Sequence, residues 1–114
     1  MDKQTIEEVV YIAERLGWSA TYNEDEDEFT FQSYSPEGQD LDVIVSAVSL
    51  TDLKHELYDC WNEYDCSEKT YIWLDDSGHG KDGAPYDMKD VYEDMEACRD
   101  MIEELSDKIN DITV

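Results

Sequence analysis

The feature that most constrains the fold is a regular apolar repeat near the C-terminal end of the chain. Its members follow one another in alternating steps of three and four residues: Met88, Val91, Met95, Cys98, Ile102, Leu105, Ile109 and Ile112. This spacing places them on one side of an α-helix. The sequence therefore predicts a long amphipathic helix over residues 87–111 that buries one face. Over about three heptads the same repeat could form a coiled coil between two chains, but packing on the chain's own sheet is the favoured interpretation.

The first half of the chain carries the patterns of one helix followed by three strands. Residues 5–16 have helical spacing, with Thr5 and Glu8 placed as a capping box and Gly17 as the stop. Beyond it, apolar and polar residues alternate in three short runs, which predicts strands over 18–23, 29–33 and 41–46. Short turn-forming segments separate these runs, so the strands should form an antiparallel meander.

Helical spacing returns after the meander. It runs from residue 49 to about residue 65, with Ser49 and Asp52 placed as a possible cap. Residues 67–86 have one short apolar patch, which predicts a short extended or helical piece, and then a loop rich in Gly. We predict a single acidic α+β domain over residues 1–114: a three-stranded antiparallel meander packed by helices, in the order α-β-β-β-α-α, with a long C-terminal helix.

Charge narrows the possible partners. The 114 residues include 31 Asp and Glu but only 8 Lys and Arg, which gives a formal net charge of −23. Nucleic acids and anionic membranes are bound through Lys and Arg, so neither is expected as a direct partner. A basic protein surface is the expected charged partner. The odd number of cysteines, together with the lack of a signal-peptide pattern or a long apolar run, predicts a cytoplasmic protein.

Motifs for catalysis or for cofactor binding are not found in the sequence. There is no C-x-x-C, H-E-x-x-H or G-x-S-x-G pattern and no glycine loop of the phosphate-binding type. A calcium loop starting at Asp75 fails because its twelfth position is Tyr86, where the EF-hand needs Glu. The sequence therefore predicts no enzyme activity, no catalytic residue, no cofactor and no metal site.

Carboxylates, in contrast, follow a clear arrangement on the two longer predicted helices after the meander. On a helical wheel of the last helix, seven of them lie opposite the apolar repeat: Glu93, Glu96, Asp100, Glu103, Glu104, Asp107 and Asp111. The preceding helix has four at steps of four, three and four: Asp52, Glu56, Asp59 and Glu63. We predict these eleven residues as the partner-binding residues. A solvated acidic face without a partner, or adaptation to high salt, is the alternative explanation.

The spacing on the last helix is close to that of nucleic-acid phosphates. From Glu93 to Asp111 the helix rises about 27 Å, so the seven carboxylates follow one another at about 4.5 Å. One strand of B-DNA has a phosphate about every 3.4 Å. The two linear charge densities agree within a factor of about two.

Small, strongly acidic single domains with carboxylate rows on helices resemble the DNA-mimic proteins of phages and mobile elements, which include anti-restriction and anti-CRISPR inhibitors. Three segments are also similar to small acidic proteins carried on mobile elements of gut bacteria: Tyr34–Asp40, Glu56–Asp65, and Gly83-Ala84-Pro85 leading into Met88 and Val91. The similarity covers most of residues 29–109 through loose motifs. It implies a phage or mobile-element origin, and it implies no catalytic residue.

Three functions follow as hypotheses. In the first, the acidic rows occupy the basic channel of a nucleic-acid-binding defence protein and exclude its substrate. In the second, the protein is an immunity protein or antitoxin that caps a basic toxin, with aromatic residues such as Trp18, Tyr71 and Trp73 in the contact. In the third, it is an accessory protein of a mobile element that forms a homodimer through the C-terminal helix.

Overall fold

A computed structural model describes residues 1–113 and confirms the α+β fold with its antiparallel meander and long C-terminal helix. A further short helix lies between the two longer helices that follow the sheet, in the segment for which the sequence left the conformation open. The elements in chain order are α1 (Lys3–Arg15), β1 (Ser19–Asn23), β2 (Glu28–Tyr34), β3 (Asp40–Ser46), α2 (Leu50–Asn62), α3 (Cys66–Ile72) and α4 (Met88–Asn110).

The first helix begins earlier than its sequence pattern suggested. Asp2 is the N-cap, and its carboxylate accepts a hydrogen bond of 2.7 Å from the backbone N–H of Thr5. The predicted capping box at Thr5 is therefore wrong, because Thr5 already lies in the first turn. The C-terminal end is as predicted: Gly17 has a φ of +96°, and the N–H of Trp18 donates to the carbonyl of Ala13 at 3.0 Å. This pairing is the Schellman motif.

The three strands form one antiparallel sheet in the order β1-β2-β3. Phe31 of β2 pairs with Ala20 of β1 on one side and with Val43 of β3 on the other. These three residues are buried, and they point to the same face of the sheet. The opposite face consists of polar side chains together with the exposed Tyr34 and Ile44. The sheet therefore buries only one of its two faces.

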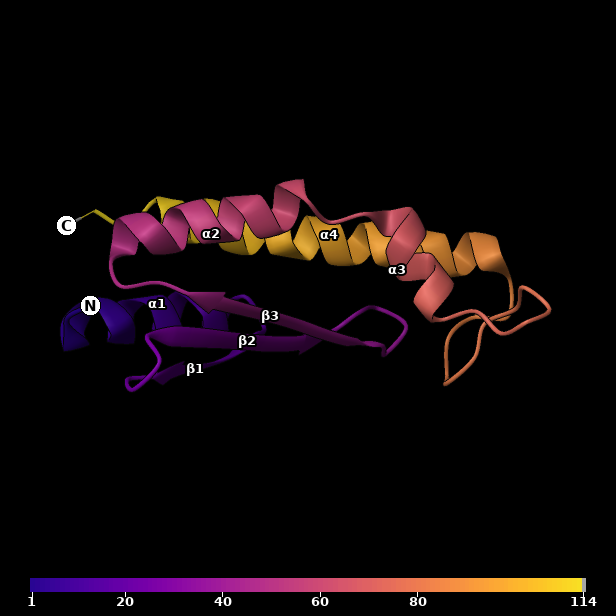
Figure 1. The fold of residues 1–114 in the computed structure, drawn as a ribbon, viewed down its shortest axis with the longest axis horizontal. Helices are drawn as coiled ribbons and strands as arrows, with labels where there is room; N and C mark the ends of the chain where they lie inside the picture. Colours follow the sequence, from indigo (N-terminus) through magenta and orange to yellow (C-terminus); the bar gives the residue numbers. More distant parts are fainter. Residues whose placement is uncertain (114) are drawn as a thin grey trace.

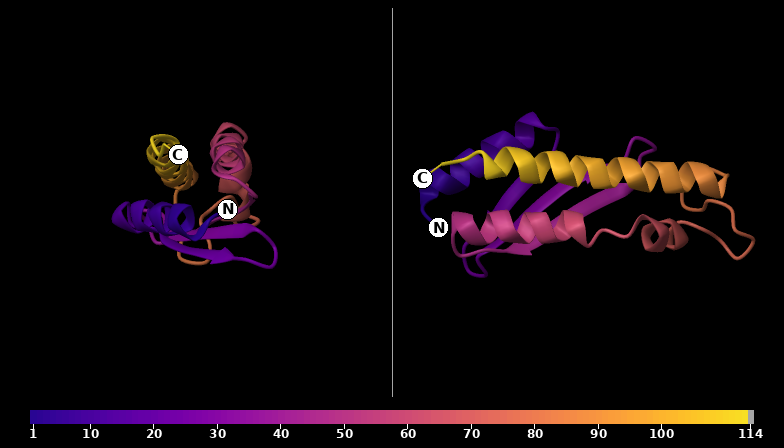
Figure 2. Two further views of the ribbon diagram at one scale, coloured as in Figure 1. Left: turned by 90° about the vertical axis from the view of Figure 1, so that its left-hand side faces the viewer. Right: turned by 90° about the horizontal axis from the view of Figure 1, so that it is seen from above.

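Helices α2 and α4 lie side by side over the buried face of the sheet, and α1 packs against β1 and α4 (Figures 1 and 2). The core between these layers includes Phe29, Phe31, Val45, Leu53, Leu57, Met95, Ile102 and Leu105. The apolar patterns of the helices and strands predict all of these residues in the core. They also predict Trp61 there, which is only half-buried. The apolar repeat of α4 from Val91 to Ile109 is buried within its own chain.

The helical layer extends beyond the sheet. In Figure 2, right, α3 and the first turns of α4 lie past the β3 side of the sheet, together with the loop that joins them. This arrangement gives the molecule an elongated shape of 49 × 22 × 22 Å. Within the described residues, no helix is both long enough and apolar enough to cross a membrane.

Candidate protein-binding surface

The first part of the candidate surface is the α4 acidic row, which consists of the seven predicted carboxylates from Glu93 to Asp111. Six of them are exposed and Glu103 is half-buried. They lie on the side of α4 opposite Val91, Ile102 and Ile109, all of which are buried. The structure therefore brings these carboxylates together in one row along the outer face of α4.

The second part is the α2 acidic row: Asp52, Glu56, Asp59 and Glu63, all exposed. Two hydrogen bonds identify the side of α2 that faces α4. Lys54 donates to the carbonyl of Ile112 at 2.6 Å, and Arg99 donates to the carbonyl of Trp61 at 3.4 Å. At 100° per residue, the α2 acidic row lies on the other side of the helix from Lys54 and Trp61. The two rows thus do not merge into one surface.

Between the two rows lies a short aromatic and cationic contact. The Arg99 guanidinium lies 5.1 Å from the centre of the Trp61 ring, and Tyr58 packs edge-on against the same ring at 5.5 Å. Arg99 is thereby held against an aromatic face. Its charge lies between the helices and not on the outer face of α4.

Almost all carboxylates of the two rows have no cationic partner within the described chain. Glu93 alone is paired, with Lys89 at 3.4 Å, and both side chains of that pair are exposed. None of the eleven carboxylates accepts a hydrogen bond from residues 1–113. Apart from Glu93, their charges and acceptor oxygens are therefore free to interact with solvent or with a partner.

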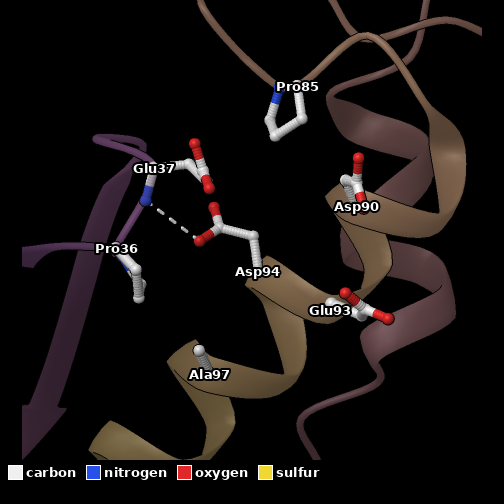
Figure 3. A pocket seen from close by; sticks show the side chains of 7 residues that line it. All are labelled: Pro36, Glu37, Pro85, Asp90, Glu93, Asp94 and Ala97. Carbon is white, nitrogen blue, oxygen red and sulfur yellow. Dashed lines mark hydrogen bonds between the residues drawn. The ribbon is translucent and has the colours of Figure 1, made fainter.

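A further carboxylate of α4, Asp94, was not predicted to have a role. It is only 4% exposed. It accepts a hydrogen bond of 2.6 Å from the Ser35 hydroxyl and one of 3.1 Å from the N–H of Glu37, and the same hydroxyl accepts from the N–H of Gln39 at 2.9 Å. Figure 3 shows Asp94 turned toward the β2–β3 turn. This contact fixes the turn against α4 and so sets the position of the first half of the α4 acidic row.

The signal that could have identified Asp94 is its place on the helical wheel. It lies about 60° from the centre of the apolar repeat, on the buried side of α4. A carboxylate on that side needs hydrogen-bond donors, and the turn from Ser35 to Gln39 supplies them. Asp94 and Glu37 also line a shallow pocket of about 330 Å³, together with Pro36, Pro85, Asp90, Glu93 and Ala97.

A second type of surface lies at the end of the molecule beyond the sheet. We call it the distal aromatic patch; its exposed members are Tyr71, Ile72, Tyr86, Met88 and Tyr92. A groove of about 300 Å³ runs between α3 and the start of α4, lined by Thr70, Tyr71, Met88 and Tyr92 among others.

Three aromatic residues were named as contacts for the hypothesis that the protein caps a basic toxin, and their surroundings in the structure differ. Tyr71 is exposed and Trp73 is half-buried, but Trp18 is only 3% exposed. The expectation that Trp18 lies on the surface is wrong, because the Schellman turn at Gly17 directs Trp18 back over the first helix and into the core.

The cysteines are poorly placed for nucleophilic chemistry. Burial raises the pKa of the Cys98 thiol to about 11, with the nearby Asp94 carboxylate acting in the same direction. Burial also raises the pKa of Cys60 and of Cys66 above the ordinary value. Since the thiolate is the reactive form, these groups stay protonated at neutral pH. Within residues 1–113, no three His, Cys, Asp or Glu side chains are grouped so as to hold a metal ion.

Comparisons of this chain with protein-family models, with curated proteins and with solved structures found no match.

Proposed function

We propose that this protein binds a basic, nucleic-acid-binding protein surface through its acidic rows and blocks it, as a nucleic-acid mimic that inhibits a host defence protein. The observation that carries the proposal is the set of exposed carboxylates along α4, from Glu93 to Asp111, of which only Glu93 has a cationic partner in the described chain. A solvated helix normally relieves such repulsion with Lys at a spacing of three or four residues.

The dimensions of the α4 acidic row support this proposal. Its length of about 27 Å corresponds to about eight phosphates of one DNA strand. Each exposed carboxylate contributes only a fraction of a kcal/mol, because exposed ion pairs are screened. Several of them against a desolvated basic channel add up, and they also speed association. The resemblance to DNA-mimic proteins is consistent with this function, and we place the encounter in the cytoplasm, that of the host cell if a phage encodes the protein.

The test compares two triple variants of equal charge. One neutralises the α4 acidic row with Glu96→Gln, Asp100→Asn and Asp107→Asn. The matched control neutralises the tip of the β1–β2 hairpin with Glu24→Gln, Asp25→Asn and Glu26→Gln, where all three residues are exposed. Both change the net charge by the same amount, so any difference between them reports position and not total charge.

The partner is first captured from a bacterial lysate at low salt and released at high salt, and its nucleic-acid binding is then measured with each protein present. We expect the parent and the hairpin control to block nucleic-acid binding equally, and the α4 variant to associate at least about tenfold more slowly. Equal inhibition by both triple variants would contradict the proposal.

The distal aromatic patch favours a second candidate, an immunity protein or antitoxin that caps a basic toxin. In such complexes a few aromatic residues contribute most of the binding energy. Tyr71→Ala and Tyr92→Ala would then each weaken binding of the captured partner by about 2 kcal/mol or more, while the α4 triple variant would bind as the parent does. The same set of proteins therefore separates the two candidates.

A further inference from the structure

Strand β3 has a free edge. It is the last strand in the order β1-β2-β3 and pairs only with β2. The ladder with β2 is fixed at its two ends, since the N–H of Ser35 donates to Gln39 and the N–H of Ala47 donates to Asp27, both at 2.8 Å. Hydrogen-bonded pairs alternate along an antiparallel ladder. The backbone N–H and C=O groups of the odd-numbered residues of β3 therefore point toward β2. The backbone groups of Asp42 and Ile44 point away from the sheet.

These outward backbone groups are unpaired in the described part of the chain. No backbone or side-chain group of residues 1–113 donates to or accepts from the main chain of Asp42 or Ile44 at this edge. Natural proteins usually protect such an edge with charged side chains, above all Lys, with Pro or a bulge, or by covering it. Here β3 has neither Lys nor Pro, its charged residues are the acidic Asp40 and Asp42, and its register with β2 is continuous over seven pairs.

A groove accompanies the free edge on the helical side. Its volume is about 270 Å³, and its walls come from three parts of the chain: Asp42, Val43 and Ile44 of β3, Cys60, Glu63 and Tyr64 at the end of α2, and Lys69 of α3, with Ile102 at the base. The helices extend past β3 on this side (Figure 2, right), so the edge lies beneath an overhang. An added strand would find an edge to pair with and a groove for its side chains.

Charge indicates what would occupy this edge. Asp40 and Asp42 are exposed on the outer face of the sheet, and Glu63 lies in the groove. A second copy of the chain would bring a further net charge of −23 to this acidic edge. Repulsion between two chains of this charge disfavours such a pairing, whereas a basic segment would be attracted by Asp40, Asp42 and Glu63.

We propose that the β3 edge binds an extended segment of a partner protein as a fourth strand, with basic residues beside Asp40 and Asp42 alternating with apolar residues that enter the groove beside Val43 and Tyr64. The alternation follows from the geometry of a strand, in which successive side chains point to opposite faces. Main-chain hydrogen bonds would supply affinity, and the groove would supply specificity. This site does not involve the α4 acidic row, and it does not depend on the function proposed above.

The probe is a synthetic peptide of alternating arginine and valine, with blocked ends and about seven residues to match β3. Its control has every backbone nitrogen methylated, which keeps all charges and side chains but removes every backbone donor. Binding is followed by amide hydrogen exchange of the protein, at about 150 mM salt to screen charge-only contacts. We expect exchange at the Asp42 and Ile44 amides to slow by about tenfold or more with the first peptide and to stay unchanged with the second.

Several results would overturn the proposal. One is binding of the first peptide without protection of Asp42 and Ile44, which would indicate a charge-only complex. Another is equal protection by the methylated peptide. A third is protection of these amides in the protein alone with a dimer in sedimentation, which would make a second copy the occupant. Protection that persists in the α4 triple variant supports the edge site even where the inhibition proposed above fails.

Discussion

Replacing Asp94 would measure how strongly one buried carboxylate joins the β2–β3 turn to α4. The Asp94→Ala variant removes the acceptor of two hydrogen bonds, from the Ser35 hydroxyl at 2.6 Å and from the Glu37 N–H at 3.1 Å. Ser35 is only 5% exposed, so its hydroxyl would lose a partner that water cannot readily replace. Glu37 is exposed, and water can replace the carboxylate there.

The magnitude follows from these surroundings. A hydrogen bond to a charged group contributes about 1.5 to 3 kcal/mol, and we assign the upper half of that range to the buried Ser35 bond. The solvated Glu37 bond contributes about 1 kcal/mol. We therefore expect Asp94→Ala to lower the free energy of unfolding by about 3 to 4 kcal/mol. Asp94→Asn should lower it by about 2 kcal/mol, because the amide can accept from only one of the two donors.

Urea unfolding followed by tryptophan fluorescence is the assay, because Trp18 is buried and changes environment on unfolding. Asp100→Ala is the matched control: it removes the same charge from an exposed position of the same helix. A double-mutant cycle of Ser35→Ala with Asp94→Ala should give a coupling of about 2 kcal/mol. If Asp94→Ala is no less stable than Asp100→Ala, or if the coupling is zero, the role assigned to Asp94 is wrong.

Two further predictions concern stability. Leu105 is fully buried, so Leu105→Ala should lower the free energy of unfolding, measured in urea, by about 2 to 5 kcal/mol. Glu103→Gln on the same helix should lower it by less than about 0.5 kcal/mol. Similar losses of stability in both variants would mean that the helix face is misassigned. A net charge of −23 with only two ion pairs in residues 1–113 should make the fold more stable in salt. We expect the melting temperature to rise by about 5 °C or more between about 10 mM and about 500 mM NaCl, and an unchanged value would contradict this.

The fold was predictable where the pattern is long or regular. The repeat from Met88 to Ile112 fixed the last helix to within one residue at each end, and the alternation around Phe29, Phe31 and Val43 identified the meander. For α3 the sequence does not decide between a helix and an extended piece, because seven residues contain too few turns for a clear period. Its N-cap Asp65, which accepts from the N–H groups of Ser67 and Glu68, is a local signal that could have decided it.

The surface was predictable only in part. Periodicity places the α4 carboxylates opposite the core, since both follow from one helical wheel. It does not give the direction in which one helix faces another, so the separation of the α2 acidic row from the α4 acidic row required the structure. The contact between Asp94 and Ser35 joins positions 59 residues apart in the chain, and no local pattern encodes such a pairing.

Because the helical layer extends beyond the sheet, we expect two units of unequal stability: the sheet with the helices over it, and the end beyond the sheet. Leu74 and Val91 are buried but do not belong to the main core cluster, and the α3 region reaches that cluster through the partly buried Cys66 and Trp73. Opening that end exposes neither Phe29 nor Leu105 to water, and it therefore costs less free energy than global unfolding. A ligand on the distal aromatic patch would act by mass action on this weaker unit and suppress its local opening. A ligand on the β3 edge would reinforce the sheet, the more stable of the two units.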